Sequence, residues 1–433
     1  MALNWKRYLA MFRVPELRKK ILIVLGLLVV FRIAAVIPVP GIDPTSLHNL
    51  FAGNQLFGLL DVFSGGGLSN LSIVMLGVGP YITASIVMQL MTMIVPRLEE
   101  MQKEEGEAGR RKINQWTRLL TVPLAALQAF AFLNLIQRGG LSGGTGPEIT
   151  FSFWQLVVTI ISVTAGTIFL MWLGELITEQ NIGNGISLII FVGIIARLPS
   201  VTAQILSTLT SDQLLTYGAF LVISVVVVAG VVIITEGQRS IPVSYAKRVR
   251  GNRMFGGVST HLPLRVNQAG VIPIIFALSI MLFPGVIANF FVGVSNAVVS
   301  SVAQRIVNAF QNQLFYGAMY FVLVVVFTYF YTAVTFDPKN VAENIQKQGG
   351  FIPGIRPGRQ TTMFLKYVIN RITLTGAIFL GFIAVLPLLL QAFTGLTTLT
   401  IGGTALLIVV SVVVETLKQI ESQLTMREYE GFS

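Results

Sequence analysis

Residue types that carry catalysis or bind metals are scarce in this chain, and they lie outside its apolar stretches. It has no cysteine, and His48 and His261 are its only histidines, which leaves no thiolate nucleophile and too few imidazoles for a convincing zinc site. All 19 aspartates and glutamates fall in predicted loops, at segment ends or in the C-terminal tail. Ion-coupled transporters and intramembrane proteases place ionisable groups within the membrane. We therefore predict no catalytic residue, no metal site and no cofactor.

The apolar stretches offer small polar side chains and isoleucines instead. The polar ones are Thr83, Ser85, Gln89, Gln128 and Ser279. Packing is their usual role, because small and hydroxyl side chains let helices approach closely. Ile82 and Ile86 are four residues apart, as are Ile190 and Ile194, so each pair shares one face of a helix. Such isoleucines usually face lipid or the core, but an apolar constriction that gates by dewetting also needs them.

Composition indicates the elements that must position these side chains. Of the 433 residues, 54% are hydrophobic and 11% are charged, against roughly 25% charged in an ordinary soluble domain. The sequence therefore predicts an integral membrane protein. The net charge of +11 could suggest a nucleic-acid partner, but the basic residues sit in loops between apolar stretches, as membrane topology requires.

Apolar stretches of roughly 20 residues predict ten transmembrane spans. They are Ile21–Val39, Gly58–Val95, Leu119–Gln137, Phe153–Leu173, Ile186–Leu206, Leu214–Thr235, Ala269–Phe291, Leu314–Phe336, Phe364–Phe393 and Leu396–Leu417.

Lysine and arginine set the orientation. All but four of the 30 lie in the N-terminal segment, in the loops after spans two, six and eight, in the first residues of span nine, or in the tail; the exceptions are Arg32, Arg138, Arg197 and Arg305. The positive-inside rule makes that face cytoplasmic, so residues 1–20, the tail at 418–433 and both termini are predicted to be cytoplasmic. Residues 4–18 are basic and amphipathic, and we expect an interfacial helix there.

The second span cannot be one regular helix. A glycine run at residues 65–67 and a second break at Gly77–Pro80 interrupt it, because glycine destabilises a helix and exposes its backbone. Lipid cannot satisfy the freed backbone groups, so such a segment must be buried by protein or line a watery cavity. We expect a short half-helix at about residues 55–64, a longer helix at Ser69–Ile94, and a pore or binding-site role for the segment.

Two predicted cytoplasmic loops, residues 236–268 and 337–362, are unusually long and basic. Retention on the cytoplasmic face and contact with anionic phospholipids would account for the charge alone. Loops of this length usually serve a function or are disordered. Their prolines and glycines favour a functional surface.

Ten spans divide into two sets of five, residues 21–206 and 207–417. If the halves are repeats, an odd number of spans in each makes them inverted in the membrane. These features leave three classes open: a channel, a secondary transporter with inverted repeats, and a lipid scramblase or passive scaffold. The chain has no GxxxxGK[ST] phosphate-binding loop, so energy for transport would have to come from a partner.

Several long motifs closely resemble the SecY family, the channel subunits of the bacterial Sec protein translocon. The matching runs, in order and with matching spacing, are GPYITASIVMQL at 79–90, EGEAGRRKINQWTR at 105–118, NIGNGISLIIF at 181–191, STHLPLRVNQAGVIPIIFA at 259–277 and FIPGIRPGRQT at 351–361. The resemblance implies an all-α hourglass of two inverted five-helix halves around a central pore. It also implies a multi-pass protein of the bacterial cytoplasmic membrane without enzymatic activity.

The resemblance further implies roles for particular residues. A plug that seals the outer funnel would lie at 58–67, including Leu59, Leu60, Asp61, Val62, Phe63, Ser64, Gly65, Gly66 and Gly67. The pore ring would consist of Ile82, Ile86, Ile190, Ile194, Ile275 and Ile408. A lateral gate between spans two and seven, flanked by spans three and eight, would include Thr83, Gln89, Gln128, Ser279 and Phe283.

The two basic loops would dock cytoplasmic partners. The implied docking residues are Lys247, Arg248, Arg250, Arg253, Arg356 and Arg359. The implied partners are the SecA motor ATPase, the ribosome, whose RNA would be reached only through docking, the subunits SecE and SecG, signal peptides and nascent polypeptides. Residues 251–253 carry one arginine where some relatives have two adjacent, so this loop tip is where the family pattern fits least well.

Overall fold

Helices account for most of the structure, which is a computed structural model. It describes residues 14–39, 64–68, 70–137, 152–208, 214–245, 248–250, 253–255, 259–292, 296–394 and 400–430. Within these ranges each of the ten predicted spans coincides with a helix. In chain order these are α2 (Pro15–Ala34), α5 (Gly79–Ile94), α7 (Gly106–Gln137), α8 (Phe153–Glu179), α9 (Gly185–Thr208), α10 (Leu214–Glu236), α11 (Ile272–Val292), α13 (Gln313–Thr335), α15 (Arg359–Thr394) and α16 (Thr400–Glu430).

Length and apolar composition support membrane crossing for many of these helices. Among the described residues, five helices are long and apolar enough to span a membrane, and α5 with α6 (Pro96–Lys103) is a sixth if this pair, bent by 104°, counts as one. Prolines inside α7, α9, α11 and α15 are tolerated because neighbouring helices in a membrane bundle re-satisfy the freed backbone groups. The predicted all-α polytopic membrane fold is confirmed.

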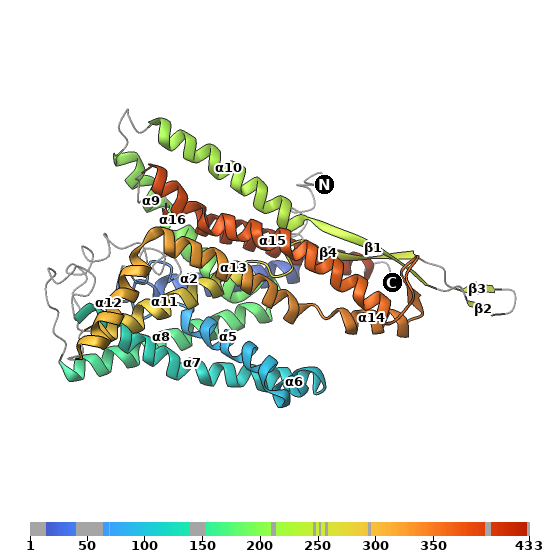
Figure 1. The fold of residues 1–433 in the computed structure, drawn as a ribbon, viewed down its shortest axis with the longest axis horizontal. Helices are drawn as coiled ribbons and strands as arrows, with labels where there is room; N and C mark the ends of the chain where they lie inside the picture. Colours follow the sequence, from blue (N-terminus) through green and yellow to red (C-terminus); the bar gives the residue numbers. More distant parts are fainter. Residues whose placement is uncertain are drawn as a thin grey trace.

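The helices form an elongated bundle with a small β-structure at one end (Figure 1). Helices α5 to α8 lie along one side, and α10, α15 and α16 lie along the other. A single large cluster of buried apolar side chains includes residues of α2, α5, α8, α9, α11, α13, α15 and α16. This cluster is the core, and it contains residues from both predicted halves.

The two long predicted cytoplasmic loops fold into one body, which sequence patterns did not predict. Strand β1 (Gln238–Tyr245) pairs antiparallel with β4 (Ser259–Arg265) and also with β5 (Gly350–Phe351) of the second loop. Helix α14 (Pro338–Lys347) begins at Asp337, whose carboxylate accepts hydrogen bonds from the backbone amides of its first turn, as an N-cap does. Ile241, Ile345 and Leu365 pack together below the sheet. The loops therefore form a joint platform at one end of the bundle (Figure 1).

The segment before α5 corrects one expectation. The predicted helix Ser69–Ile94 begins only at Gly79, and residues 70–78 form turns instead. Leu71 and Gly77 have φ of +45° and +58°, which no α-helix allows. The backbone amide of Val39 donates to the carbonyl of Leu71 at 2.8 Å, and that of Ile73 donates to Ile37 at 3.0 Å. These bonds to the chain after α2 replace helical ones.

Two further differences concern short helices. Pro15 to Arg18, expected in an interfacial helix over residues 4–18, form the first turn of α2, because proline suits the first helical position; the rest of that expected helix lies outside the described residues. Helix α12 (Ala297–Gln311) lies between α11 and α13, at the opposite end of the bundle from α14 (Figure 1). The sequence reading placed only a connection there.

Candidate functional site

Four helices bring the isoleucines of the implied ring into one buried cluster. Two come from α5, two from α9, one from α11 and one from α16, and all belong to the main core cluster. Their exposed fractions are 8% or less: Ile82, Ile86, Ile190, Ile194, Ile275 and Ile408. Val78 and Ile274 pack into the same cluster. Such a grouping excludes water, so it suits a closed constriction without charge.

Protein buries the described part of the glycine-broken segment, which is one of the two environments that the sequence allowed. Ser64, Gly65, Gly66 and Gly67 are buried turn residues next to the core. The hydroxyl of Ser64 accepts a 3.0 Å hydrogen bond from the amide of Leu68. Leu59, Leu60, Asp61, Val62 and Phe63 of the implied plug lie outside the described residues.

The next turns of this segment lie directly against α8. A Cβ atom added at Gly166 would be 2.0 Å from the carbonyl oxygen of Ile73, so only glycine allows this approach. Val74 and Ser72 are completely buried. This irregular backbone is therefore covered by helices and exposes little to lipid.

The implied gate residues lie on α5, α7 and α11, and α11 packs against the other two. The hydroxyl of Thr83 donates to Gly79 at 3.0 Å and that of Ser279 to Ile275 at 2.9 Å, so both bond within their own helices. The amide of Gln89 donates to Ser85 at 3.3 Å, and among the described residues its Oε1 is buried without a hydrogen-bond partner. Gln128 is half-buried on α7. The side chain of Phe283 lies outside the described part.

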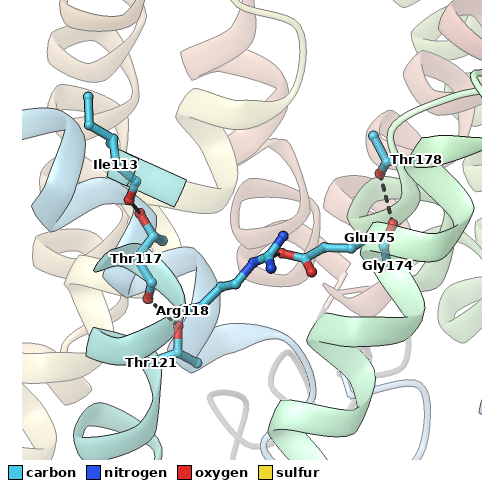
Figure 2. Close-up of polar contacts among 7 residues, drawn as sticks. All are labelled: Ile113, Thr117, Arg118, Thr121, Gly174, Glu175 and Thr178. Carbon is cyan, nitrogen blue, oxygen red and sulfur yellow. Dashed lines mark hydrogen bonds and ion pairs between the residues drawn. The ribbon is translucent and has the colours of Figure 1, made fainter. Parts of the chain in front are cut away.

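An ion pair that sequence reasoning missed joins α7 to α8. Figure 2 shows Arg118 and Glu175 reaching toward each other, with Nε 2.6 Å from Oε1. Both residues lie near the ends of predicted spans, so the sequence marked them only as flanking charges. Threonines on both helices donate to carbonyls within their own helix, as in Thr178 to Gly174 at 2.8 Å (Figure 2). The ion pair thus links α7, which the family resemblance places beside the gate, to α8.

The motif at 181–191 contains the tight turn between α8 and α9 and the first residues of α9. The hydroxyl of Thr178 also accepts the amide of Gly185 at 2.9 Å, and a Cβ at residue 185 would lie 1.8 Å from the carbonyl oxygen of Gly174. The side-chain amide of Gln423, on α16, donates to the carbonyl of Asn181. The motif therefore ties α9, with its two ring isoleucines, to α8 and α16.

A cavity of about 950 Å³ opens between the ends of α5, α6 and α7 on one side and α13, α14 and α15 on the other. Its lining mixes both charge signs with aromatic and apolar groups. Charged lining residues are Glu99, Arg110, Asp337, Lys339 and Lys366. The lining residues come from two stretches far apart in sequence, residues 92–110 and 329–373, so spacing alone could not reveal this cavity.

The implied docking residues lie at the platform end of the bundle. Arg248 and Arg250 are on β2 (Arg248–Arg250) and Arg253 is on β3 (Arg253–Phe255), with Arg250 directly opposite Arg253 across the hairpin. This hairpin extends beyond the platform (Figure 1). Arg356 and Arg359 are exposed; Gly354 and Gly358, with φ of +81° and +97°, shape the turn that presents Arg356. Lys247 lies outside the described residues.

Known proteins resemble this chain over most of its length. The family model SecY matches residues 72–417. The protein translocase subunit SecY of Mycobacterium bovis is 46% identical over 439 aligned residues, which cover 98% of this chain and 99% of the relative. The protein of the same description from Streptomyces galbus is also 46% identical, covering 97% and 98% of the two chains.

Solved structures agree on the fold. One described as a protein conducting channel matches with a TM-score of 0.61 at 19% identity, covering 92% of this chain and 90% of that one. A second, concerning a SecY plug domain that stabilises the closed channel and maintains a membrane seal, matches at 0.59 with the same identity and coverage. Sec61 in a canine ribosome-channel complex matches at 0.56 with 18% identity and the same coverage. The family model and the relatives' identity over nearly the whole chain, together with the shared fold, establish that this chain belongs to the SecY family.

Proposed function

We propose that this chain is the protein-conducting subunit of a bacterial Sec translocase, passing unfolded secretory polypeptides across the membrane and releasing transmembrane segments sideways into lipid. The observation that carries the proposal is the buried grouping of six isoleucines from four helices beside a glycine-rich segment buried by protein. An apolar ring that fits around an extended chain lets polypeptide pass without strong binding while holding ions back. Such a pore needs no titratable group at its constriction.

The proposed entry is the cavity between α5–α7 and α13–α15. It lies toward the platform end, which also carries the exposed Arg356 and Arg359. Its mixed lining can hydrogen-bond varied peptide segments without fixing any one of them. Since the proposed channel has no nucleotide-binding loop of its own, force on the polypeptide has to come from a docked partner.

The proposed plug comprises residues 58–67, and the proposed lateral gate is the seam between α5 and α11. The plug proposal rests on family membership and on the buried turn at Ser64–Gly67. The gate proposal rests on the packing of α11 against α5 and α7, with short polar side chains along the seam. Apolar segments of a client could leave through this seam according to their own free energy of transfer into lipid.

The proposed partners follow from the platform and the family. The basic β2–β3 hairpin and the Arg356 turn would bind the ribosome, with its RNA contacted only there, or the SecA motor. SecE and SecG would accompany the channel, and anionic phospholipids would contact the remaining basic residues. The proposed location is the bacterial cytoplasmic membrane, with both termini on the cytoplasmic side.

Export of a secretory precursor into vesicles tests this proposal. Vesicles containing the translocase assembled with this chain, SecA and ATP should protect the precursor from added protease. Omission of the motor should abolish protection, and a precursor without its signal peptide should remain exposed. Equal protection with and without this chain would contradict the proposed function.

A further inference from the structure

Arg32 is an arginine within an apolar helix, and its side chain bonds to the glycine segment. It lies in the last turn of α2, between the exposed Ile33 and the buried Phe31. Its Nη1 donates a 2.5 Å hydrogen bond to the carbonyl oxygen of Gly65, 33 residues further along the chain. The guanidinium carbon also lies 5.9 Å from the ring centre of Phe31. Arg32 therefore joins the first span to the glycine run.

The accepting residue is held in one position from two sides. Gly65 has φ of +70°, and a Cβ there would lie 2.8 Å from Cζ of Phe31 and 2.9 Å from Cα of Gly193. Gly65 is thus wedged between α2 and α9, the helix that carries Ile190 and Ile194. At position 65, residues other than glycine are disfavoured both by the positive φ and by the lack of space for a Cβ atom.

The bond to Arg32 has a specific energetic role. Buried carbonyl groups without a donor are costly in a site that excludes water, and a charged donor makes a stronger hydrogen bond than a neutral one. The arginine also lies at the C-terminal end of α2, where positive charge is favoured. Losing the guanidinium would leave the Gly65 carbonyl without this donor and would remove the charge from the end of α2.

We propose that Arg32 is a positioning residue that anchors the Ser64–Gly67 turn against α2 and α9 and so fixes one end of the plug. The anchor itself involves only Arg32 and Gly65. Its consequence for sealing rests on the proposed channel function. Displacing the Ser64–Gly67 turn then requires the Arg32–Gly65 bond to break. Anchor strength would set how often the channel opens without a client.

The absence of native cysteine allows a direct test of the anchor. Ser64→Cys introduces the only thiol of the chain at a buried position, 2% exposed, next to the anchored carbonyl. The complete translocase in vesicles is treated with a water-soluble maleimide, and the rate of labelling is measured. Arg32→Gln in this background should accelerate labelling at least about tenfold, because local opening exposes the thiol. Arg32→Lys should give an intermediate rate, because it keeps the charge but loses the planar fork.

Arg305→Gln is the matched control, because Arg305 is an exposed arginine on α12 at the same end of the bundle. It should leave the labelling rate unchanged. Unchanged labelling in Arg32→Gln would overturn the anchor. If Arg32→Gln fails to assemble, Gly65→Ala with Arg32 intact provides the second variant, since its methyl group must push the turn away from Phe31 and Gly193. Slow labelling in Gly65→Ala would equally overturn the proposal.

Ion leak measured on the same vesicles separates the anchor from the channel function. Faster labelling together with increased leak supports both the anchor and the seal. Faster labelling in vesicles that stay tight supports the anchor and removes the sealing role of the plug.

Discussion

At the scale of single residues, the isoleucines of the proposed ring would act through their size and lack of polarity. Ile86 and Ile275 face the same buried cluster from α5 and α11. Replacing either with serine shortens the side chain and adds a polar group that holds water. We expect ion leak through the resting channel to rise at least about tenfold. Leu221→Ser on the exposed surface of α10 is the control. Unchanged ion leak in both isoleucine variants would contradict the proposal that these isoleucines seal the pore.

Gln89 carries a buried polar atom without a hydrogen-bond partner among the described residues. Leaving its Oε1 in this situation costs roughly 1–3 kcal/mol. Gln89→Leu should relieve this cost and stabilise the closed seam. We expect export of precursors with weak signal peptides to fall several-fold, while those with strong signals are less affected. Faster export of both kinds would contradict this reading.

Arg356 belongs to the proposed docking surface and not to the core, because it is exposed on a turn that glycines shape. Arg356→Glu should leave the chain folded and inserted but reduce partner-driven export at least about tenfold, because like charge opposes an acidic partner surface. Arg305→Glu, at the other end of the bundle, changes charge equally and should export normally. Normal export by Arg356→Glu would contradict the docking role.

At the scale of elements, the sequence predicted the helices of the bundle well. Membrane helices must satisfy their backbone internally, so apolar length located a helix within each of the ten predicted spans. Apolar length failed to predict the structure where backbone groups form hydrogen bonds to another segment of the chain. Residues 70–78 look apolar enough to be helical, but hydrogen bonds to residues 37 and 39 hold them in turns. The platform was missed because its pairing of β1 with β5 joins segments about a hundred residues apart.

The platform predicts that the two basic loops act together. Ile352 is 3% exposed and packs with Ile241 and Ile345 in one buried apolar cluster. Ile352→Ala should cost the platform roughly 2–5 kcal/mol and weaken partner binding although every docking arginine remains. Phe351→Ala is the control, since this neighbouring side chain is 38% exposed. Equal partner affinity in both variants, measured by binding to vesicles, would mean that the loops dock independently.

The whole molecule combines six buried isoleucines of the proposed ring, a buried glycine turn at residues 64–67 and a platform of two loops at one end. The ring isoleucines could be proposed from spacing and family resemblance because they lie on regular helices. Arg32 and the Arg118–Glu175 pair could not, since a lone arginine or glutamate near the end of a span reads as a flanking charge. The cavity between α5–α7 and α13–α15 likewise exists only once the halves are packed together.

Conductance across a planar bilayer tests the central claim most directly. The purified translocase with the intact chain is compared with one lacking residues 58–67. We predict that the intact protein is tight to ions and that the deletion opens and closes spontaneously with a measurable current, because the ring alone seals less completely. Equal tightness in both would contradict a plugged aqueous pore and would return the inverted-repeat transporter and the passive scaffold to consideration.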